Sequence, residues 1–285
     1  MAKDTGAMVR ERSLPAGWYP TNELDVRNQC SAWASDDHAA ARSDFVSAIV
    51  PHAGWFFSGR IAFQTLSRLA PRPDVVAVLG GHLHPHDPVR VAPEDAIATP
   101  LGVLPVDTAL ADVLTRELNA TSDRAPDNTV EIQMPFVAYL FPECRVLYAR
   151  VPPSGQAIRV GEAIAEYASG AGLSVRVVGS TDLTHYGPNY GFVDHGRGAT
   201  ALEWVSSQSD RPIINSMLAM DGSQAIRLAT ANHSACSVGA AVAAMSFARA
   251  CGVDHGTEVE YSTSYAVQPS DSFVGYVGIG FGPGR

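Results

Sequence analysis

The sequence contains no run of basic residues, no long apolar segment and no regular spacing of cysteines. Its 285 residues include 20 Lys and Arg against 29 Asp and Glu, which gives a net charge of -9 at pH 7. Nucleic acids and anionic membranes require clustered cations, so this balance argues against both as partners. No apolar stretch reaches the roughly 20 residues that span a bilayer, and the N-terminus lacks the apolar core of a signal peptide. We therefore expect a cytoplasmic protein.

The four cysteines form no CxxC motif, and each has to be interpreted alone: Cys30, Cys144, Cys236 and Cys251. A disulfide framework is not expected in a chain of this length. The hydrophobic content of 46% and the charged content of 17% are ordinary for a folded enzyme. We expect one α/β domain over residues 1–285, with residues 1–13 frayed, and two fused halves as the alternative.

Short apolar runs that end in turn residues predict buried strands, and they alternate with helical patterns. This alternation is typical of a largely parallel or mixed central sheet flanked by helices. The longer predicted strands are 45–50, 74–79, 145–151, 173–178, 258–265 and 273–281, and residues 89–91 and 96–104 are expected to form a hairpin. The predicted helices begin at Thr21 or Asn22 and continue with 59–69, 107–118, 161–168, 201–206, 213–219, 222–230 and 236–249.

Three of the predicted strands are followed by histidine or aspartate. The residues delivered in this way are His52, then His82, His84 and His86, and finally Asp182 with His185. The carboxyl ends of parallel strands lie on one edge of a sheet, so these side chains can meet in one crevice although they are far apart in sequence. The pattern therefore predicts a functional site at that edge.

Cys236 is a further candidate for the same site. It stands at the start of the predicted helix 236–249, where the helix dipole is expected to lower the thiol pKa and favour the thiolate. Two neutral imidazoles and one anionic ligand resemble the facial arrangement that holds non-haem Fe(II), with positions open for substrate and dioxygen. Zinc held by two histidines and one cysteine is chemically as plausible.

Three acidic or basic residues are candidates for proton transfer or positioning. Asp182 and His185 could act as a general base or as a pair that orients a ligand, but a capping Asp with a packed His is the alternative. Glu131 lies in an apolar segment and must therefore be paired or protonated, which structure alone could require.

A set of short motifs occurs in a fixed order along nearly the whole chain. They lie at residues 15–20, 51–59, 79–82, 99–102, 130–135, 180–187, 236 and 272–276. In these residues the sequence resembles the Memo family, also named AmmeMemoRadiSam system protein B. The fold of that family is similar to class III extradiol ring-cleaving dioxygenases, which implies an α/β sheet with a metal at one edge. The resemblance implies His52, His82 and Cys236 as ligands, with Cys236 where the dioxygenases carry a carboxylate.

Two departures from the family pattern bear on the chemistry. The stretch Gly80-Gly81-His82 is one residue shorter than its counterpart, and counting back from Thr99-Pro100 favours its histidine as ligand over His84. Asn128 replaces the first histidine of a conserved family segment, and Gln133 takes an amide option further along it. An amide can hold a hydrogen bond but carries no proton near neutral pH, so acid/base chemistry at these two positions is in doubt.

The resemblance implies a metal-dependent, dioxygenase-like oxidoreductase, with iron (Fe²⁺) favoured and copper or zinc as alternatives. Its partners would be a small aromatic or chelating substrate and dioxygen, and its catalytic candidates are His185, Asp182 and Glu131. One alternative is an adaptor that binds a metal or peptide in the crevice without turnover. Another is a cysteine hydrolase in which Cys236 attacks and a histidine acts as base. The oligomeric state is not predictable from this sequence.

Overall fold

The core of the protein is a mixed β-sheet. In the computed structural model, which describes residues 6–35 and 44–282, nine strands form this sheet in the order β10-β12-β2-β9-β3-β8-β4-β7, with β11 paired to β12. Its four central strands are mutually parallel: β2 (Ser47–Val50), β9 (Val175–Ser180), β3 (Val75–Gly80) and β8 (Arg145–Arg150). The parallel strands therefore end at one common edge.

Antiparallel strands extend this sheet on both sides. On the side of β2 they are β12 (Phe273–Phe281), β10 (His185–Tyr186) and β11 (Gly256–Thr263). On the side of β8 they are β4 (Arg90–Val91) and, parallel to β4, β7 (Thr121–Ser122). A second small sheet holds β1 (Val9–Arg10), β5 (Ala96–Thr99) and β6 (Gly102–Pro105).

Strand β3 shows why the sheet is covered on both faces. All six of its residues are buried, and alternate side chains of a strand point to opposite faces. Val75, Ala77 and Leu79 therefore belong to one hydrophobic cluster, whereas Val76 and Val78 belong to another. A continuous apolar run of this kind predicts helices on both sides, as observed.

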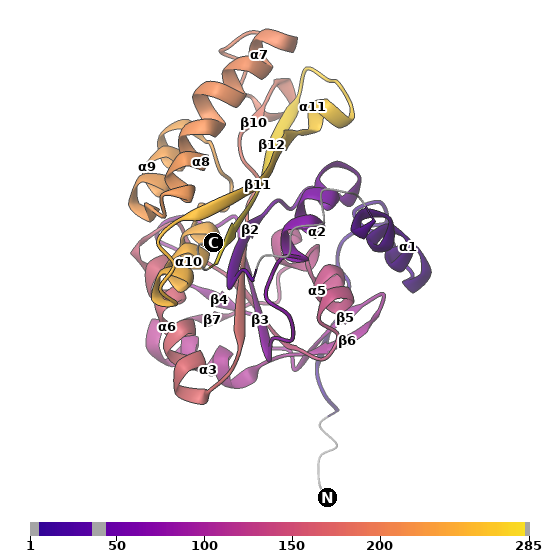
Figure 1. Ribbon diagram of the computed structural model, residues 1–285, viewed down its shortest axis with the longest axis vertical. Coiled ribbons are helices and arrows are strands. Elements are labelled where there is room, and N and C mark those ends of the chain that lie inside the picture. Colours follow the sequence, from indigo (N-terminus) through magenta and orange to yellow (C-terminus); the bar gives the residue numbers. More distant parts are fainter. Residues whose placement is uncertain (1–5, 36–43, 283–285) are drawn as a thin grey trace, which may run out of the picture.

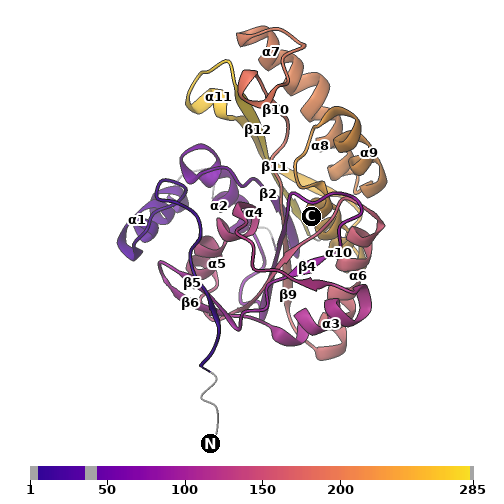
Figure 2. The ribbon, with the colours of Figure 1, turned by 180° about the vertical axis from the view of Figure 1, so that it is seen from behind.

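The helices lie in two layers on either side of the sheet (Figures 1 and 2). One face is covered by α3 (Thr108–Leu118), α6 (Gly155–Ala171) and α10 (Val238–Ala250), with α8 (Arg211–Leu218) and α9 (Gly222–Asn232) packed further along. The other face is covered by α1 (Glu23–Ala34), α2 (Arg60–Leu66) and α5 (Met134–Leu140). The predicted α/β architecture, a mixed sheet flanked by helices, is confirmed.

Shorter helical segments lie near the ends of the strands. The α-helical ones are α4 (Asn128–Glu131), α7 (Gly198–Trp204) and α11 (Ser264–Val267). Two π-helical segments, η2 (Trp55–Gly59) and η4 (Val205–Asp210), lead into α2 and α8, and η3 (Pro188–Tyr190) is a 3₁₀ turn. In Figure 1, α7, β10 and α11 lie together at one end of the molecule.

Helix α10 packs unusually close to the sheet because glycines remove side chains from the contact. A Cβ atom on Gly179 of β9 would lie 2.5 Å from the carbonyl oxygen of Ala240, and one on Gly239 would lie 2.4 Å from that of Val151. Both distances are far below normal contact, so neither position tolerates a larger residue without movement of the helix. This close packing holds the segment before α10, which contains Cys236, against the end of β9.

Several local expectations can now be compared with the structure. Asn22 caps α1, as predicted, by accepting a hydrogen bond from the backbone N–H of Asp25 at 3.0 Å. The expectation of fraying is wrong for Val9–Arg10, because this segment pairs with β5; residues 1–5 lie outside the described part of the chain. The hairpin predicted from 89–91 and 96–104 is also wrong, because Arg90–Val91 joins the main sheet. Among the described residues, no helix is long and apolar enough to cross a membrane.

Candidate metal centre

Three neighbouring strands deliver the central residues of the site with the same spacing. His52 stands two residues after β2 ends at Val50, His82 two residues after β3, and Asp182 two residues after β9. Strands β2, β9 and β3 are adjacent and parallel, so their ends converge as the sequence pattern predicts.

His52, His82 and Cys236, named here the His–His–Cys cluster, come together at this edge. Each offers one ligand atom, and these atoms all lie within 4.8 Å of one another. The Nε2 atom of His52 is 3.2 Å from the Sγ atom of Cys236. The rings of His52 and His82 meet edge to face, with centroids 5.2 Å apart. The exposed His84 lies outside this cluster, and its backbone N–H donates to the carboxylate of Asp87.

The ring of His52 is held in a defined orientation. Its Nδ1 atom is 3.3 Å from the hydroxyl of Ser180, which also accepts a hydrogen bond from the Nε2 of Gln133 at 3.1 Å. The same amide donates to the carbonyl of Pro51 at 2.8 Å. In the tautomer with the proton on Nδ1, the ring donates to Ser180 and the free electron pair lies on Nε2, on the side of Cys236. This tautomer presents Nε2 as the ligand atom.

Loss of solvent around the rings keeps both histidines of the cluster neutral, although His52 is buried and His82 is exposed at its outer side. Burial lowers the pKa of His52 to about 4, because the ring is removed from water. Loss of solvent and then the proximity of His52 also lower the pKa of His82. A neutral imidazole is the form that binds a metal ion, so both rings are in the required protonation state at neutral pH.

The thiol of Cys236 behaves differently from the sequence-based expectation. Helix α10 begins at Val238, so Cys236 precedes it and Ser237 is the capping residue. Burial, and then the nearby charge of Asp182, raises the pKa of Cys236 to about 12. The expected low pKa from the helix dipole is therefore wrong for the metal-free protein. A bound metal ion would stabilise the Cys236 thiolate where the helix dipole does not, because metal coordination displaces the thiol proton.

These residues fit a transition metal. Nitrogen and sulfur ligands lie about 2.0–2.3 Å from such an ion, so two ligands of one ion are at most about 4.6 Å apart. The separations within the cluster are compatible with that limit after small side-chain adjustments. The donor set of two imidazoles and one sulfur is the chemistry of zinc, iron and copper rather than of calcium or magnesium.

Asp182 and His185 both line the cavity that opens beside the cluster. Asp182 accepts a hydrogen bond from the backbone N–H of His52 at 2.7 Å, and burial raises its pKa to about 6. His185 has its Nδ1 3.1 Å from the carbonyl of Leu183, and burial lowers its pKa. Because a carbonyl can only accept, Nδ1 carries the proton and Nε2 of His185 is free to accept another.

Glu131 lies in a different environment. Its carboxylate accepts hydrogen bonds from the backbone N–H of Ser13 at 3.1 Å and of Leu14 at 2.9 Å, and from the hydroxyl of Tyr19 at 3.0 Å. The hydroxyl of Ser13 donates to it as well. We call this group the N-terminal clamp, because it fixes residues 13–19 against α4. Glu131 is not among the described residues that line the cavity, and its predicted catalytic role stays a prediction.

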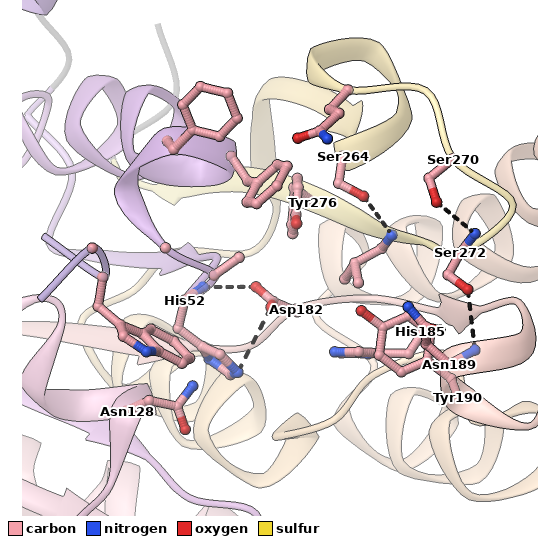
Figure 3. A pocket seen from close by; sticks show the side chains of 18 of the residues that line it. His52, Asn128, Asp182, His185, Asn189, Tyr190, Ser264, Ser270, Ser272 and Tyr276 are labelled. Carbon is pink, nitrogen blue, oxygen red and sulfur yellow. Dashed lines mark hydrogen bonds and ion pairs between the residues drawn. The ribbon is translucent and has the colours of Figure 1, made fainter. Parts of the chain in front are cut away.

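The cavity beside the cluster has a volume of about 620 Å³. Figure 3 shows Asn128 beside His52 on one side, and Ser270 and Ser272 across the cavity. Ser272 belongs to the motif at 272–276, whereas no sequence signal points to Ser270, nor to Asn189, Tyr190 and Gln268, which also line the cavity. The turn residues around Gly187-Pro188 and the Ser-rich stretch before β12 mark loops, but a loop signal does not tell which cavity it borders.

The fold and the His–His–Cys cluster define an α/β protein with a candidate transition-metal centre. The model of a family described as Memo-like protein matches residues 10–280. The chain therefore belongs to the Memo family, and the resemblance noted in the sequence is confirmed.

Individual relatives match this chain over most of their length. It is 28% identical to a MEMO1 family protein of Thermococcus onnurineus, over 96% of this chain and 99% of the relative. It is 31% identical to the MEMO1 family protein MK0963 of Methanopyrus kandleri, over 82% of each. A crystal structure of the uncharacterized protein JW3007 from Escherichia coli K12 matches with a TM-score of 0.45 and 12% identity, covering 82% of this chain and 99% of that one.

Proposed function

We propose that this protein is a metal-dependent oxidoreductase that holds Fe²⁺ on His52, His82 and Cys236 and acts on a small aromatic or chelating substrate. One observation carries the proposal: three ligand atoms lie within 4.8 Å of one another, and two of the residues that offer them, His52 and His82, line a cavity of about 620 Å³. Three protein ligands leave coordination positions open, and the cavity gives a substrate access to them. When bound, the metal would supply a Lewis acid and a site for electron transfer.

The protein's own residues supply binding and proton transfer in this proposal. Nε2 of His185 accepts the proton that a phenolic substrate loses on binding, because its Nδ1 is already committed to the carbonyl of Leu183. Asp182 fixes the backbone at His52, and its ionised form at neutral pH stabilises the protonated His185. Both residues line the cavity, so neither requires movement of the fold to reach a substrate.

One distance favours a second candidate, a cysteine hydrolase. The Sγ of Cys236 and the Nε2 of His52 are 3.2 Å apart, which is within reach for a nucleophile and its base. The protonation states argue against it. Burial raises the pKa of the thiol to about 12 and lowers that of the imidazole to about 4, so proton transfer between them is strongly uphill. Iodoacetamide without effect and chelators with a full effect on activity would exclude the hydrolase.

Metal binding is tested by purifying the protein without oxygen, loading it with Fe²⁺ and measuring iron per chain. We expect one iron in the native protein and none in His52→Ala. His84→Ala is the matched control, because this exposed histidine is close to His82 in sequence but lies outside the cluster, and it should keep one iron. Absence of bound iron, zinc and copper in the native protein would contradict the proposal.

Redox activity requires a separate measurement. Oxygen uptake by the iron-loaded protein is recorded with a series of catechols and thiols, and His185→Gln serves as the test of proton transfer. We expect uptake with at least one catechol, and a drop of about 10²–10⁴-fold in the variant, which is the usual contribution of a general base. Stoichiometric iron without oxygen uptake would favour a metal-binding adaptor instead.

A further inference from the structure

We infer that the cavity selects an aromatic substrate whose far end is uncharged, such as an alcohol, ether or carboxamide, and that it rejects a carboxylate or phosphate at that end. This inference rests on the proposed function, and it adds a substrate class to it. It depends on Asn189, Gln268, Ser270 and Ser272, which we name the outer subsite and which line the cavity.

Cationic side chains are missing from the lining. Among the described residues around the cavity, none is Lys or Arg, and Asp182 is the carboxylate of the set. Two arginines that form ion pairs are likewise outside this lining. Arg150 forms buried ion pairs with Asp123 and Asp127, and the exposed Arg197 lies 3.8 Å from the carboxylate of Asp271.

The outer subsite is open to solvent, because Asn189, Gln268 and Ser270 are exposed. A carboxylate there would gain no cation from the lining, and the charge of Asp182 would repel it. A divalent ion with one thiolate would keep a net charge of +1, and the catechol oxygens that bind the ion would take up that charge in the proposed site. A substrate with an uncharged far end avoids the repulsion.

The serines of the outer subsite are prepared to donate hydrogen bonds. The hydroxyl of Ser272 accepts from the backbone N–H of Asn189 at 3.1 Å, and that of Ser270 accepts from the N–H of Ser272 at 3.2 Å (Figure 3). Each hydroxyl also carries one hydrogen to donate. The described residues provide no acceptor within hydrogen-bond distance for either hydrogen.

The backbone contacts thus fix both oxygens and leave their hydrogens available to a ligand. Gln268 adds an amide that can donate and accept. Neutral donors of this kind pair with an uncharged oxygen without needing a charge on it. The outer subsite therefore matches a hydroxyl, ether or amide oxygen.

Aromatic side chains border the cavity between the cluster and solvent. Phe56 is 67% exposed and Tyr190 is 47% exposed, which is unusual for side chains of this size. Phe57 packs edge to face on Phe56, with ring centroids 4.9 Å apart, and Tyr190 meets the ring of His185 in the same way at 5.0 Å. A ring bound between them would cover apolar surface that otherwise faces water.

The test uses two catechols that differ only at the far end: 4-(2-hydroxyethyl)catechol and 3,4-dihydroxyphenylacetate. Their dissociation constants are measured by calorimetry on the zinc-loaded protein, in which the ligands do not turn over, and again on the metal-free protein. We expect the alcohol to bind about tenfold more tightly than the carboxylate in both states, because the two ligands share the catechol and differ in charge.

Gln268→Arg places a cation in the outer subsite and should bring the two affinities to about the same value. Gln208→Arg is the matched control, because it adds the same charge at an exposed residue outside the cavity lining and should keep the tenfold preference. Ser270→Ala should weaken binding of the alcohol by about two- to tenfold, the value of one hydrogen bond.

Equal or tighter binding of the carboxylate by the native protein, or no measurable binding of the alcohol, would overturn the inference. Zinc content is determined on the same samples. A protein that binds no metal but still prefers the alcohol would contradict the proposed function and support the outer subsite. A protein with one zinc per chain that prefers the carboxylate would contradict the outer subsite alone.

Discussion

The His–His–Cys cluster and the N-terminal clamp are both groups of polar side chains that the fold brings together, but their hydrogen bonding differs. In the clamp, the carboxylate of Glu131 accepts from two backbone N–H groups and two hydroxyls. In the cluster, imidazole nitrogens and a sulfur face one another, and the thiol of Cys236 is the donor available to Nε2 of His52. The hydrogen bonds of the clamp are satisfied without a ligand. In the cluster, by contrast, three ligand atoms converge on a space where a metal cation could bind them.

This difference separates a structural site from a binding site. A buried acceptor surrounded by donors stabilises the fold, because each partner compensates the loss of water. In the cluster the one donor is a thiol, and a metal ion that displaced its proton would bind all three ligand atoms at once. The clamp should therefore control the free energy of unfolding, and the cluster should control metal affinity.

Among these variants, removal of the Cys236 sulfur is expected to change metal affinity most. A small change would contradict the contrast between the cluster and the clamp. Cys236→Ser should weaken zinc affinity by about 10³-fold or more, because a hydroxyl is not deprotonated in the way that a coordinating thiol is. Competition with a chromophoric chelator measures the change. Retention of native affinity would show that Cys236 is not a ligand.

The pH dependence of metal affinity is a second test of whether Cys236 is a ligand. The pKa of Cys236 is raised to about 12, so binding between pH 7 and 9 must release one thiol proton, and affinity should rise about tenfold per pH unit. The imidazoles contribute nothing to the slope there, because that of His52 has a pKa of about 4 and that of His82 is also lowered. In Cys236→Asp the slope should be near zero, since that carboxylate is ionised throughout. An equal dependence of metal affinity on pH in the native protein and in Cys236→Asp would contradict the assignment of Cys236 as a ligand.

Mutation of the clamp should lower stability and leave metal binding unchanged. Glu131→Gln leaves N–H donors facing an amide N–H₂ group and should lower the free energy of unfolding by about 2–3 kcal/mol. Urea denaturation of the metal-free protein measures this loss. Metal per chain should stay at one in the folded variant. A loss of metal with an unchanged free energy of unfolding would show that Glu131 supports metal binding rather than the stability of the fold.

The smallest effect is expected from the residues that orient His52. Gln133→Leu removes the donor to Ser180 and to the carbonyl of Pro51 but touches none of the three ligands. Metal affinity should fall about 10-fold, the usual cost of losing an outer partner of a metal-bound histidine. Gln133→Glu is the comparison, because it keeps the size but offers no amide donor. Unchanged affinity in both variants would show that Ser180 alone orients the ring.

The sequence predicted the sheet and the meeting of His52, His82 and Asp182 well because these depend on local patterns. Each residue follows a buried β-branched strand, and parallel strands end at one edge. Cys236 was a candidate from its place at the start of a predicted helix, and the family resemblance implied it as a ligand, but its distance of 3.2 Å from His52 depends on long-range packing. Its pKa was predicted in the wrong direction, because burial is a tertiary property that outweighs a helix end.

Other features depend on tertiary contacts that no local pattern indicates. Glu131 was correctly expected to need a partner, but its partners lie more than a hundred residues earlier, and of these Ser13 belongs to the segment expected to be frayed. The outer subsite consists of short polar residues in loops, where no periodicity indicates which side chains face a cavity. Ser272 belongs to the motif at 272–276, but that motif does not indicate that its side chain lines the cavity.

X-ray absorption at the metal edge of the loaded protein tests most directly whether two imidazoles and one sulfur share one ion. We predict one sulfur at about 2.3 Å, together with two imidazole nitrogens at about 2.0–2.1 Å, and loss of the sulfur shell in Cys236→Asp. A spectrum of the native protein with nitrogen and oxygen ligands alone would contradict this account.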